Sequence, residues 1–366
     1  MKVSKYPIFK DRLVAQNFTF SVDKNGHEVP LQSDLREEYK ALREGIAYTD
    51  LSHILIYRLT GNDIVAFLDY TLSGNVGKLR EEHILHTLCL NTDGKILTDV
   101  YVVNDEDQFL VLADGGEHAK VEAFWDCYKK EYDVHLEKLN VSHGLFSLDG
   151  PYAWKPVKSV FGPEILGLTY LGFIRKKEAD DDIYILRAGK TGEYGYWILA
   201  PQHQLGTIYD KLVNAADEYP KRWYGKSLID LARLENRFFN LDVEGNFTRN
   251  PYELGLFWTI YSDKQMAAGE ALASIVNTGI PKSIIGCILE NQDVQVGDTI
   301  FYKDTAIGII AAHGFSYTKN SAIGLALLEK DYSYVGLTFY AGAQRIPLRT
   351  ISTPFLFNKS LSIKIE

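Results

Sequence analysis

The sequence predicts an α+β protein that ends in a small β barrel. Up to about residue 280, patterns typical of strands are followed by patterns typical of amphipathic helices. From about Ser283 onward the pattern changes to short strands separated by turns. The 366 residues are too many for one ordinary core and suit two or three lobes, since domains usually hold about 100–200 residues.

The first half of the chain opens with a helix pattern over residues 33–45. Ser33 is a capping-type residue, acidic side chains follow it, and Gly45 is a stop signal. The elements expected next are strand 54–59, helix 64–71, a hairpin of strands 87–91 and 96–103 around the turn 92–95, strand 108–114 and a helix at about 117–131.

The second half repeats this alternation before the barrel begins. Its expected elements are strands 145–148 and 184–188 and helices 202–216 and 228–237. The barrel strands include 284–289, 299–302, 307–312 and 323–328. Strands and helices therefore segregate into small α+β layers followed by an all-β tail.

The composition is that of a folded protein surrounded by water. With 46% hydrophobic and 24% charged residues, the chain fits neither a disordered nor a membrane protein. A formal net charge of -9 works against binding nucleic acid or anionic membranes, so we expect neither as a partner. Cys89, Cys127 and Cys287 form no C-x-x-C pair, and the N-terminus lacks the apolar core of a secretory signal; together these features predict a cytoplasmic protein.

Several common catalytic signatures are absent from the sequence. It contains neither G-x-G-x-x-G nor a lysine-bearing phosphate loop, which disfavours NAD and ATP chemistry. Ser316 lacks the second glycine of a nucleophile elbow and is expected to be a turn residue. Glu81, Glu82, His83 and His86 include two histidines without a third nearby, so we predict surface or helix-face residues and no metal site.

The segment from Asn91 to Asp99 carries the most informative candidate for chemistry. Asp99 lies at the start of a strand rich in Val and Tyr, where a carboxylate can point into a cleft beside aromatic side chains. Burial there would raise its pKa and make it a usable proton carrier. The alternative is that Asp99 only caps the hairpin, and spacing alone favours that alternative.

Taken in order, several motifs resemble those of the aminomethyltransferase (glycine cleavage T-protein) family. The resemblance covers nearly the full length from about Glu38, and the ordered set is far more specific than any single piece. The matching segments are 38–43 (EYKALR), 48–53 (YTDLSH), 59–63 (LTGND) with 67–68 and 74–76, 93–99, 190–196 (KTGEYGY), 232–235 (ARLE), 250–258 (NPYELGLFW), 308–310 and 322–327 (AIGLAL).

The resemblance implies a three-lobed cloverleaf with a central channel for tetrahydrofolate. Two interlocked ferredoxin-like lobes would span residues 1–278 and form the folate-binding catalytic region, and a β barrel would span residues 279–366. The family moves one-carbon units onto folate, which implies a small-molecule one-carbon donor and admits a carrier protein as partner. In the family, a carboxylate after the hairpin lies beside folate N5, and its position matches Asp99. Such a group can manage a proton or stabilise positive charge at an amine nitrogen.

The sequence also departs from the family pattern at several site positions. Thr98 replaces the first acid of a pair, and Asp114 replaces the usual Asn, as in relatives that demethylate dimethylsulfoniopropionate. Trp197 stands where the family has its pterin-binding glutamate, Lys190 replaces a tyrosine and Ile229 replaces an arginine. Loss of that glutamate would leave pterin N–H groups unpaired, at a cost of about 1–3 kcal/mol each.

These considerations predict Asp99 and Asp114 as the catalytic residues. The residues expected to bind the cofactor are Thr98, His86, Lys190, Tyr196, Trp197, Phe238 and Trp258. Among them, Trp197, Phe238 and Trp258 would wall the channel by stacking, with plain core packing as the alternative, and Lys190 would pair with a folate carboxylate or an acidic substrate.

The leading hypothesis is a tetrahydrofolate-dependent methyl or aminomethyl transferase, a divergent demethylase or tailoring enzyme. Two alternatives stay open. The first is the same fold with folate binding lost, acting on another aromatic or acidic substrate, and the second is a non-catalytic binding protein.

Overall fold

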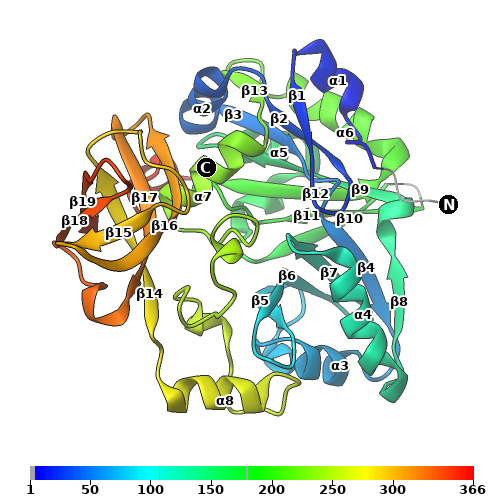
Figure 1. The fold of residues 1–366 in the computed structure, drawn as a ribbon. Coiled ribbons are helices and arrows are strands. Elements are labelled where there is room, and N and C mark those ends of the chain that lie inside the picture. The colour runs from blue at the N-terminus through cyan, green and yellow to red at the C-terminus, as the bar shows by residue number, and fades with distance from the viewer. Residues whose placement is uncertain (1–4, 107, 179) are drawn as a thin grey trace.

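The computed structural model describes residues 5–106, 108–178 and 180–366, which fold into three parts (Figure 1). Two α+β lobes, each built on one sheet, are followed by a closed barrel of six strands. The predicted α+β class with a C-terminal barrel is therefore confirmed. Most predicted elements are present, with ends shifted by a few residues.

The first lobe is built on a sheet with the strand order β5-β6-β7-β4-β8, in which all neighbours are antiparallel. Its strands are β4 (Leu55–Thr60), β5 (Ile84–Leu90), β6 (Ile96–Asp105), β7 (Gln108–Asp114) and β8 (His135–Lys138). Its helices are α3 (Ile64–Thr71) and α4 (His118–Tyr128), with short 3-10 turns η1 (Val76–Lys78), η2 (Lys129–Glu131) and η3 (Leu139–Val141).

The second lobe is built on a sheet with the strand order β10-β11-β12-β9-β3-β13. Its strands are β3 (Ile46–Asp50), β9 (His143–Asp149), β10 (Phe173–Glu178), β11 (Asp181–Leu186), β12 (Gly195–Pro201) and β13 (Lys221–Trp223). Its helices are α5 (Trp154–Phe161) and α6 (Gln202–Asn214), with η4 (Pro163–Gly167). The lobes interlock because β3 of the second sheet precedes β4 of the first sheet in the chain.

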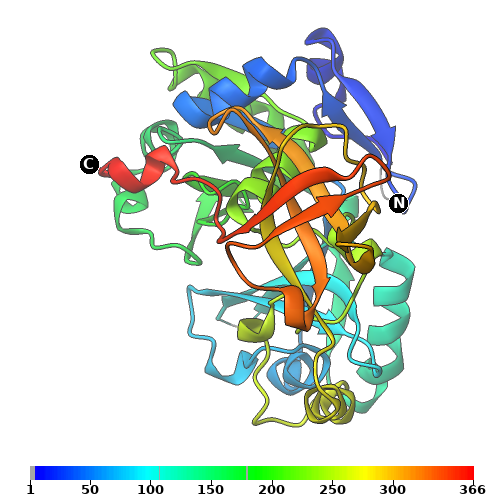
Figure 2. The ribbon, with the colours of Figure 1, turned by 60° about the vertical axis from the view of Figure 1, so that its left-hand side comes forward.

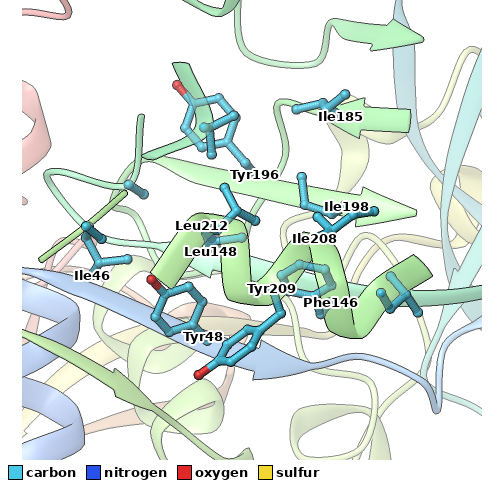
Figure 3. Close-up of a cluster of buried hydrophobic side chains, with 14 of the residues drawn as sticks. Ile46, Tyr48, Phe146, Leu148, Ile185, Tyr196, Ile198, Ile208, Tyr209 and Leu212 are labelled. Carbon is cyan, nitrogen blue, oxygen red and sulfur yellow. The ribbon is translucent and has the colours of Figure 1, made fainter. Parts of the chain in front are cut away.

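Alternation along the strands divides the interior into layers. In β12, Tyr196 and Ile198 pack toward α6 in the core that Figure 3 shows, whereas Trp197 and Leu199 belong to a core shared with the first sheet. In β6, Tyr101 and Val103 belong to that shared core, whereas Val100 and Val102 belong to the core that includes α3 and α4. Successive side chains point to opposite faces of a strand, so parity decides which residues face the space between the sheets.

The N-terminal segment and two further helices pack beside the second lobe. They comprise α1 (Lys10–Ala15), β1 (Thr19–Val22), β2 (Glu28–Gln32), α2 (Leu35–Glu44) and α7 (Lys226–Asn236). The side chain of Asp34, one residue after the predicted cap Ser33, accepts hydrogen bonds from the amides of Arg36 and Glu37 and caps α2. The helix ends at Gly45, where a Cβ atom would lie 2.1 Å from the carbonyl oxygen of Pro220.

The barrel closes in the order β14-β17-β16-β15-β18-β19 around its own apolar core. Its strands are β14 (Lys282–Leu289), β15 (Thr299–Tyr302), β16 (Thr305–Ser316), β17 (Ser321–Glu329), β18 (Thr338–Ala341) and β19 (Ile346–Ile351), and α8 (Gly269–Thr278) precedes them. Figure 2 shows the C-terminal segment, in red, leaving the barrel. The segment packs on the second lobe, where Ser360 donates a hydrogen bond to Glu193. The remaining 3-10 turns are η5 (Glu244–Asn246), η6 (Phe257–Thr259), η7 (Lys330–Tyr332) and η8 (Lys359–Ser362).

Candidate functional site

A cavity with about 710 Å³ of empty space, including the open solvent at its mouth, lies between the two sheets and α7. Strand parity places its walls, because Ser147 and Asp149 of β9 and Trp197 of β12 occupy the alternate positions that face the first sheet. Asp114 at the end of β7 and Lys190 in the loop between β11 and β12 complete the polar side of the cavity. The cavity is thus formed jointly by both lobes.

Four charged side chains meet at this wall. Asp99 and Asp114 are paired across β6 and β7, and the ammonium of Lys190 contacts Asp99 Oδ2 and lies 2.7 Å from Asp114 Oδ2. Arg233 of α7 donates to the same oxygen of Asp114. These side chains are at most 11% exposed, so solvent screens their attraction only weakly.

This cluster overturns the expected protonation of Asp99. Burial alone would raise the pKa of Asp99, but the nearby charges of His86 and Lys190 and their hydrogen bonds lower that pKa to about 2. Burial is likewise outweighed at Asp114, whose pKa is lowered mainly by Arg233 and Lys190. The prediction that Asp99 has a raised pKa is therefore wrong, and both carboxylates are anions at neutral pH.

Lys190 also differs from its expected role. Its ammonium is already paired with two carboxylates of the protein, so it is not a free cation awaiting a ligand carboxylate. The side chain nevertheless lines the cavity beside Asp114, whereas Asp99 lies behind it and is not among the residues that line the cavity. A ligand in the cavity would meet Lys190 and Asp114 before Asp99.

His86 connects Asp99 to a group of aromatic side chains. Its Nε2 lies 2.6 Å from Asp99 Oδ1, and its ring stacks on Tyr101 with 4.4 Å between centroids. The ring of Trp258 meets the same imidazole in an edge-to-face arrangement, with 5.4 Å between centroids, and Trp258 is 58% exposed. His86 is therefore part of a β-strand and fixed by the site carboxylate. Trp258 covers the histidine from outside instead of lining the cavity.

Parity also corrects the placement of two expected cofactor-binding residues. Thr98 follows the face of β6 opposite to that of Asp99, and its hydroxyl donates to the carbonyl oxygen of Gly115 at 2.9 Å, which fixes the hairpin. Tyr196 lies in the hydrophobic core that includes α6 (Figure 3). The guanidinium of Arg187 lies over its ring. Neither side chain lines the central cavity. Trp197, the neighbour of Tyr196, faces the cavity, and Asp99, the neighbour of Thr98, faces Lys190 behind the cavity wall.

The three predicted aromatic walls have different surroundings. Trp197 lines the central cavity and is 4% exposed. Phe238 instead lines a second groove between α7 and the barrel, because the chain turns at Arg237, in a left-handed conformation, directly after α7. The prediction that Phe238 walls the channel is therefore wrong.

Sequence reasoning did not assign a role to Arg233 or Asp149. Arg233 was present in a matched motif, and its position on an amphipathic helix could have indicated a side chain facing the sheets. Asp149 ends a strand whose residues Leu145, Phe146 and Leu148 are apolar. It shares the face of Leu145 and Ser147, and this alternation brings its buried carboxylate to the cavity.

Among the residues described, no group of three or more His, Cys, Asp and Glu side chains is arranged to hold a metal ion. No helix within 5–106, 108–178 or 180–366 is long and apolar enough to cross a membrane.

The lobes, the barrel and the central cavity place the molecule in a known fold class. The crystal structure of the glycine cleavage system aminomethyltransferase T from Bartonella henselae superposes with a TM-score of 0.86 over 98% of this chain and 99% of that chain, at 19% sequence identity. The chain therefore has the T-protein fold, the predicted three-lobed cloverleaf.

Sequence comparison identifies the family. The GCVT N-terminal domain matches residues 9–264, and the glycine cleavage T-protein C-terminal barrel domain matches residues 282–356. Proteins named aminomethyltransferase are 25% identical in Pseudothermotoga lettingae, over 85% of this chain and 86% of that protein, and 27% identical in Thermosipho melanesiensis, over 85% and 86%. The chain belongs to the aminomethyltransferase family and is a transferase of one-carbon groups.

Proposed function

We propose that this protein transfers a methyl or aminomethyl group to tetrahydrofolate bound in the central cavity. The observation that carries the proposal is that Lys190, at the wall of that cavity, bonds both to Asp114 at the same wall and to Asp99 behind it, in a chain of the aminomethyltransferase family. We further propose that the protein acts in the cytoplasm on a small-molecule donor or on a carrier protein that presents the one-carbon unit.

The side chains around the cavity suit a reduced folate. Leu51, Ile54, Trp197 and Ile229 offer apolar surface to a planar ring system. The hydroxyl of Thr49 is buried at the cavity wall without a hydrogen-bond partner among the described residues, so it can bond to a polar edge of that ring. When bound, tetrahydrofolate supplies a nucleophilic nitrogen that accepts the one-carbon unit.

The ionised carboxylates define what the protein contributes. Because the pKa of Asp99 is lowered to about 2, this side chain is a fixed anion at neutral pH, and we assign it the stabilisation of positive charge instead of proton transfer. Lys190 positions both carboxylates, and Arg233 holds Asp114. A rigid set of charges needs little rearrangement when charge develops during transfer.

The class of donor follows from the residues at which this chain departs from the family pattern. Asp114 and Lys190 differ from the family pattern described above, so we propose a divergent demethylase or tailoring activity over glycine cleavage itself. A second candidate function is that the protein has lost folate binding and acts on another aromatic or acidic substrate. The side chains of Trp197 and Ile229 at the cavity wall favour this candidate, because neither can accept a hydrogen bond from a pterin N–H group.

Isothermal titration calorimetry with tetrahydrofolate tests the proposal. Binding in the micromolar range followed by turnover with a methyl or aminomethyl donor is the expected result. Absence of binding at millimolar ligand would remove folate from the proposal and leave the second candidate. Binding without turnover for any methyl or aminomethyl donor would identify a non-catalytic binding protein.

A further inference from the structure

Asp149 is a buried carboxylate at the wall of the central cavity for which the proposed function has no role. It is 1% exposed and lies at the end of β9, beside the start of β12. Its hydrogen-bond donors are all neutral hydroxyls: Ser147 at 2.5 Å and Tyr224 at 2.7 Å on Oδ2, and Thr191 at 3.1 Å on Oδ1. No basic side chain of the described chain forms an ion pair with it within 4.0 Å.

The two carboxylate oxygens are used unequally. Each carboxylate oxygen can accept two hydrogen bonds, so Oδ2 is saturated whereas Oδ1 has one acceptor position left among the described contacts. Gly189 and Gly195 flank Oδ1, and a Cβ atom at either position would lie 3.1 or 2.8 Å from it. Both glycines therefore keep the surroundings of Oδ1 free of side chains.

A buried carboxylate with neutral partners is unfavourable unless a further donor reaches it. Burial raises the pKa of Asp149 to about 6, and hydrogen bonds from Ser147, Tyr224 and Thr191 offset only part of that effect. The same cavity holds a second unsatisfied group, because Thr49 is 1% exposed and its hydroxyl has no partner within the described residues. The Asp149 carboxylate and the Thr49 hydroxyl thus both line this cavity, and each can form a further hydrogen bond.

We infer that Asp149 is a binding residue that accepts a hydrogen bond from an amino or ring N–H group of the ligand in the central cavity. This inference rests on the proposed function and deepens it, because the pterin ring of tetrahydrofolate carries an amino group next to a ring N–H. Asp149 lies opposite the strand position just before Tyr196 and two residues before Trp197, so it can pair with the ring edge while Trp197 contacts the ring. The protein should then prefer ligands whose ring edge carries an N–H donor over ligands that lack one.

The test compares Asp149→Asn with the wild-type protein in calorimetric titrations. Two probes are used: tetrahydrofolate, and an analogue with hydrogen in place of the pterin 2-amino group. We expect Asp149→Asn to bind tetrahydrofolate about 10- to 100-fold more weakly, since hydrogen bonds to charged groups are the stronger ones. The wild-type protein should prefer tetrahydrofolate over the analogue, and the variant should lose most of that preference.

Asp50→Asn is the matched control. Asp50 is also a buried carboxylate with neutral partners, the amide of Phe9 and the amide and hydroxyl of Ser52, but it does not line the central cavity. We expect it to leave both affinities within about twofold of the wild-type values.

A second measurement does not depend on the folding of any variant. If the ligand binds the ionised form of Asp149, wild-type protein titrated near pH 6 in buffers of different ionisation enthalpy should release a proton on binding. The charged or titratable groups that act on Asp149 are Arg187 and Tyr224, and His53 and Lys190 are further titratable groups at the cavity. The pKa of Tyr224 is raised well above 10, so it does not titrate near pH 6.

The outcomes separate the inference from the proposed function. Failure of the wild-type protein to bind tetrahydrofolate overturns both. Binding by the wild-type protein with unchanged affinity in Asp149→Asn overturns the inference alone. Should the variant not fold, absence of proton release by the wild-type protein near pH 6 overturns the inference in the same way.

Discussion

Asp99 and Asp114 occupy paired positions on β6 and β7, and the ammonium of Lys190 bonds to both carboxylates. Two buried anions at directly opposed strand positions repel each other, and a cation bonded to both offsets that repulsion. The ion pairs with Lys190 therefore allow both carboxylates to be buried as anions. Its removal should affect folding as well as chemistry.

Lys190→Met is expected to lower the free energy of unfolding by about 3–5 kcal/mol, because it leaves two buried carboxylates without their shared partner. Urea unfolding at pH 7 measures the loss. Lys226→Met is the control, since Lys226 pairs with Asp230 one helical turn away with both side chains about one third exposed, and it should cost about 0.3–0.5 kcal/mol. Equal losses for the two variants would contradict a special role for Lys190.

Asp99→Asn is expected to reduce one-carbon transfer to tetrahydrofolate at least about 100-fold while ligand affinity stays similar. The amide cannot supply the negative charge that the proposed function assigns to Asp99, and loss of one preorganised electrostatic contact typically costs about 10²–10³ in rate. Single-turnover kinetics and calorimetry measure the two quantities separately. An unchanged rate would refute the role of Asp99 and leave Asp114 as the remaining candidate.

The fold could be predicted from the sequence because local patterns carry it. Apolar runs ended by turns located the strands, and the ordered motifs beginning at Glu38 indicated the three lobes. Strand parity would also have separated Thr98 from Asp99 and Tyr196 from Trp197, since adjacent side chains in a strand face opposite sides. This alternation determines which side chains of each strand face the cavity.

The protonation of the site could not be predicted in the same way. The expected rise in the pKa of Asp99 followed from burial, which is present, but two basic groups from other elements outweigh it. Lys190 comes from a loop of the second lobe, distant in sequence from Asp99, and local patterns give no information on such contacts. The position of Phe238 was missed for a similar reason, since it follows a left-handed residue after α7 that redirects the chain.

The raised pKa of Asp149 makes a prediction for stability. A carboxyl group whose pKa rises from 3.8 to about 6 on folding favours the folded state below pH 3.8, and this contribution is lost as the pH rises through 6. The shift corresponds to about 3 kcal/mol. In thermal unfolding between pH 4 and 7, Asp149→Asn should therefore gain stability relative to wild-type protein as the pH rises.

The lowered pKa of Asp99 acts in a separate window, since its contribution is lost only as the pH falls from about 4 toward 2. That separation lets one series of melting curves distinguish the two groups. A constant difference between Asp149→Asn and the wild-type protein across pH 4 to 7 would contradict the raised pKa of Asp149.

Arg43 of α2 holds the loop that carries Lys190 in place, although the two residues are far apart in the sequence. The Arg43 guanidinium donates to the carbonyl oxygen of Thr191 at 2.9 Å and pairs with the fully buried carboxylates of Glu193 and Glu235. Arg43→Met should lower the free energy of unfolding by about 3–5 kcal/mol, because it leaves two buried anions unpaired. It should also slow one-carbon transfer, since Thr191 directly follows Lys190.

Arg12→Met is the control for this prediction. Arg12 forms a bidentate pair with Asp210, but both side chains are at least 41% exposed, so removing the pair should cost less than about 1 kcal/mol. Denaturant unfolding and transfer rates measured on both variants check the argument. Loss of stability in Arg43→Met with the transfer rate of the wild-type protein would mean that Arg43 stabilises the fold without positioning Lys190. The ion pair between Asp114 and Arg233 would then be enough to keep the geometry of the carboxylate cluster.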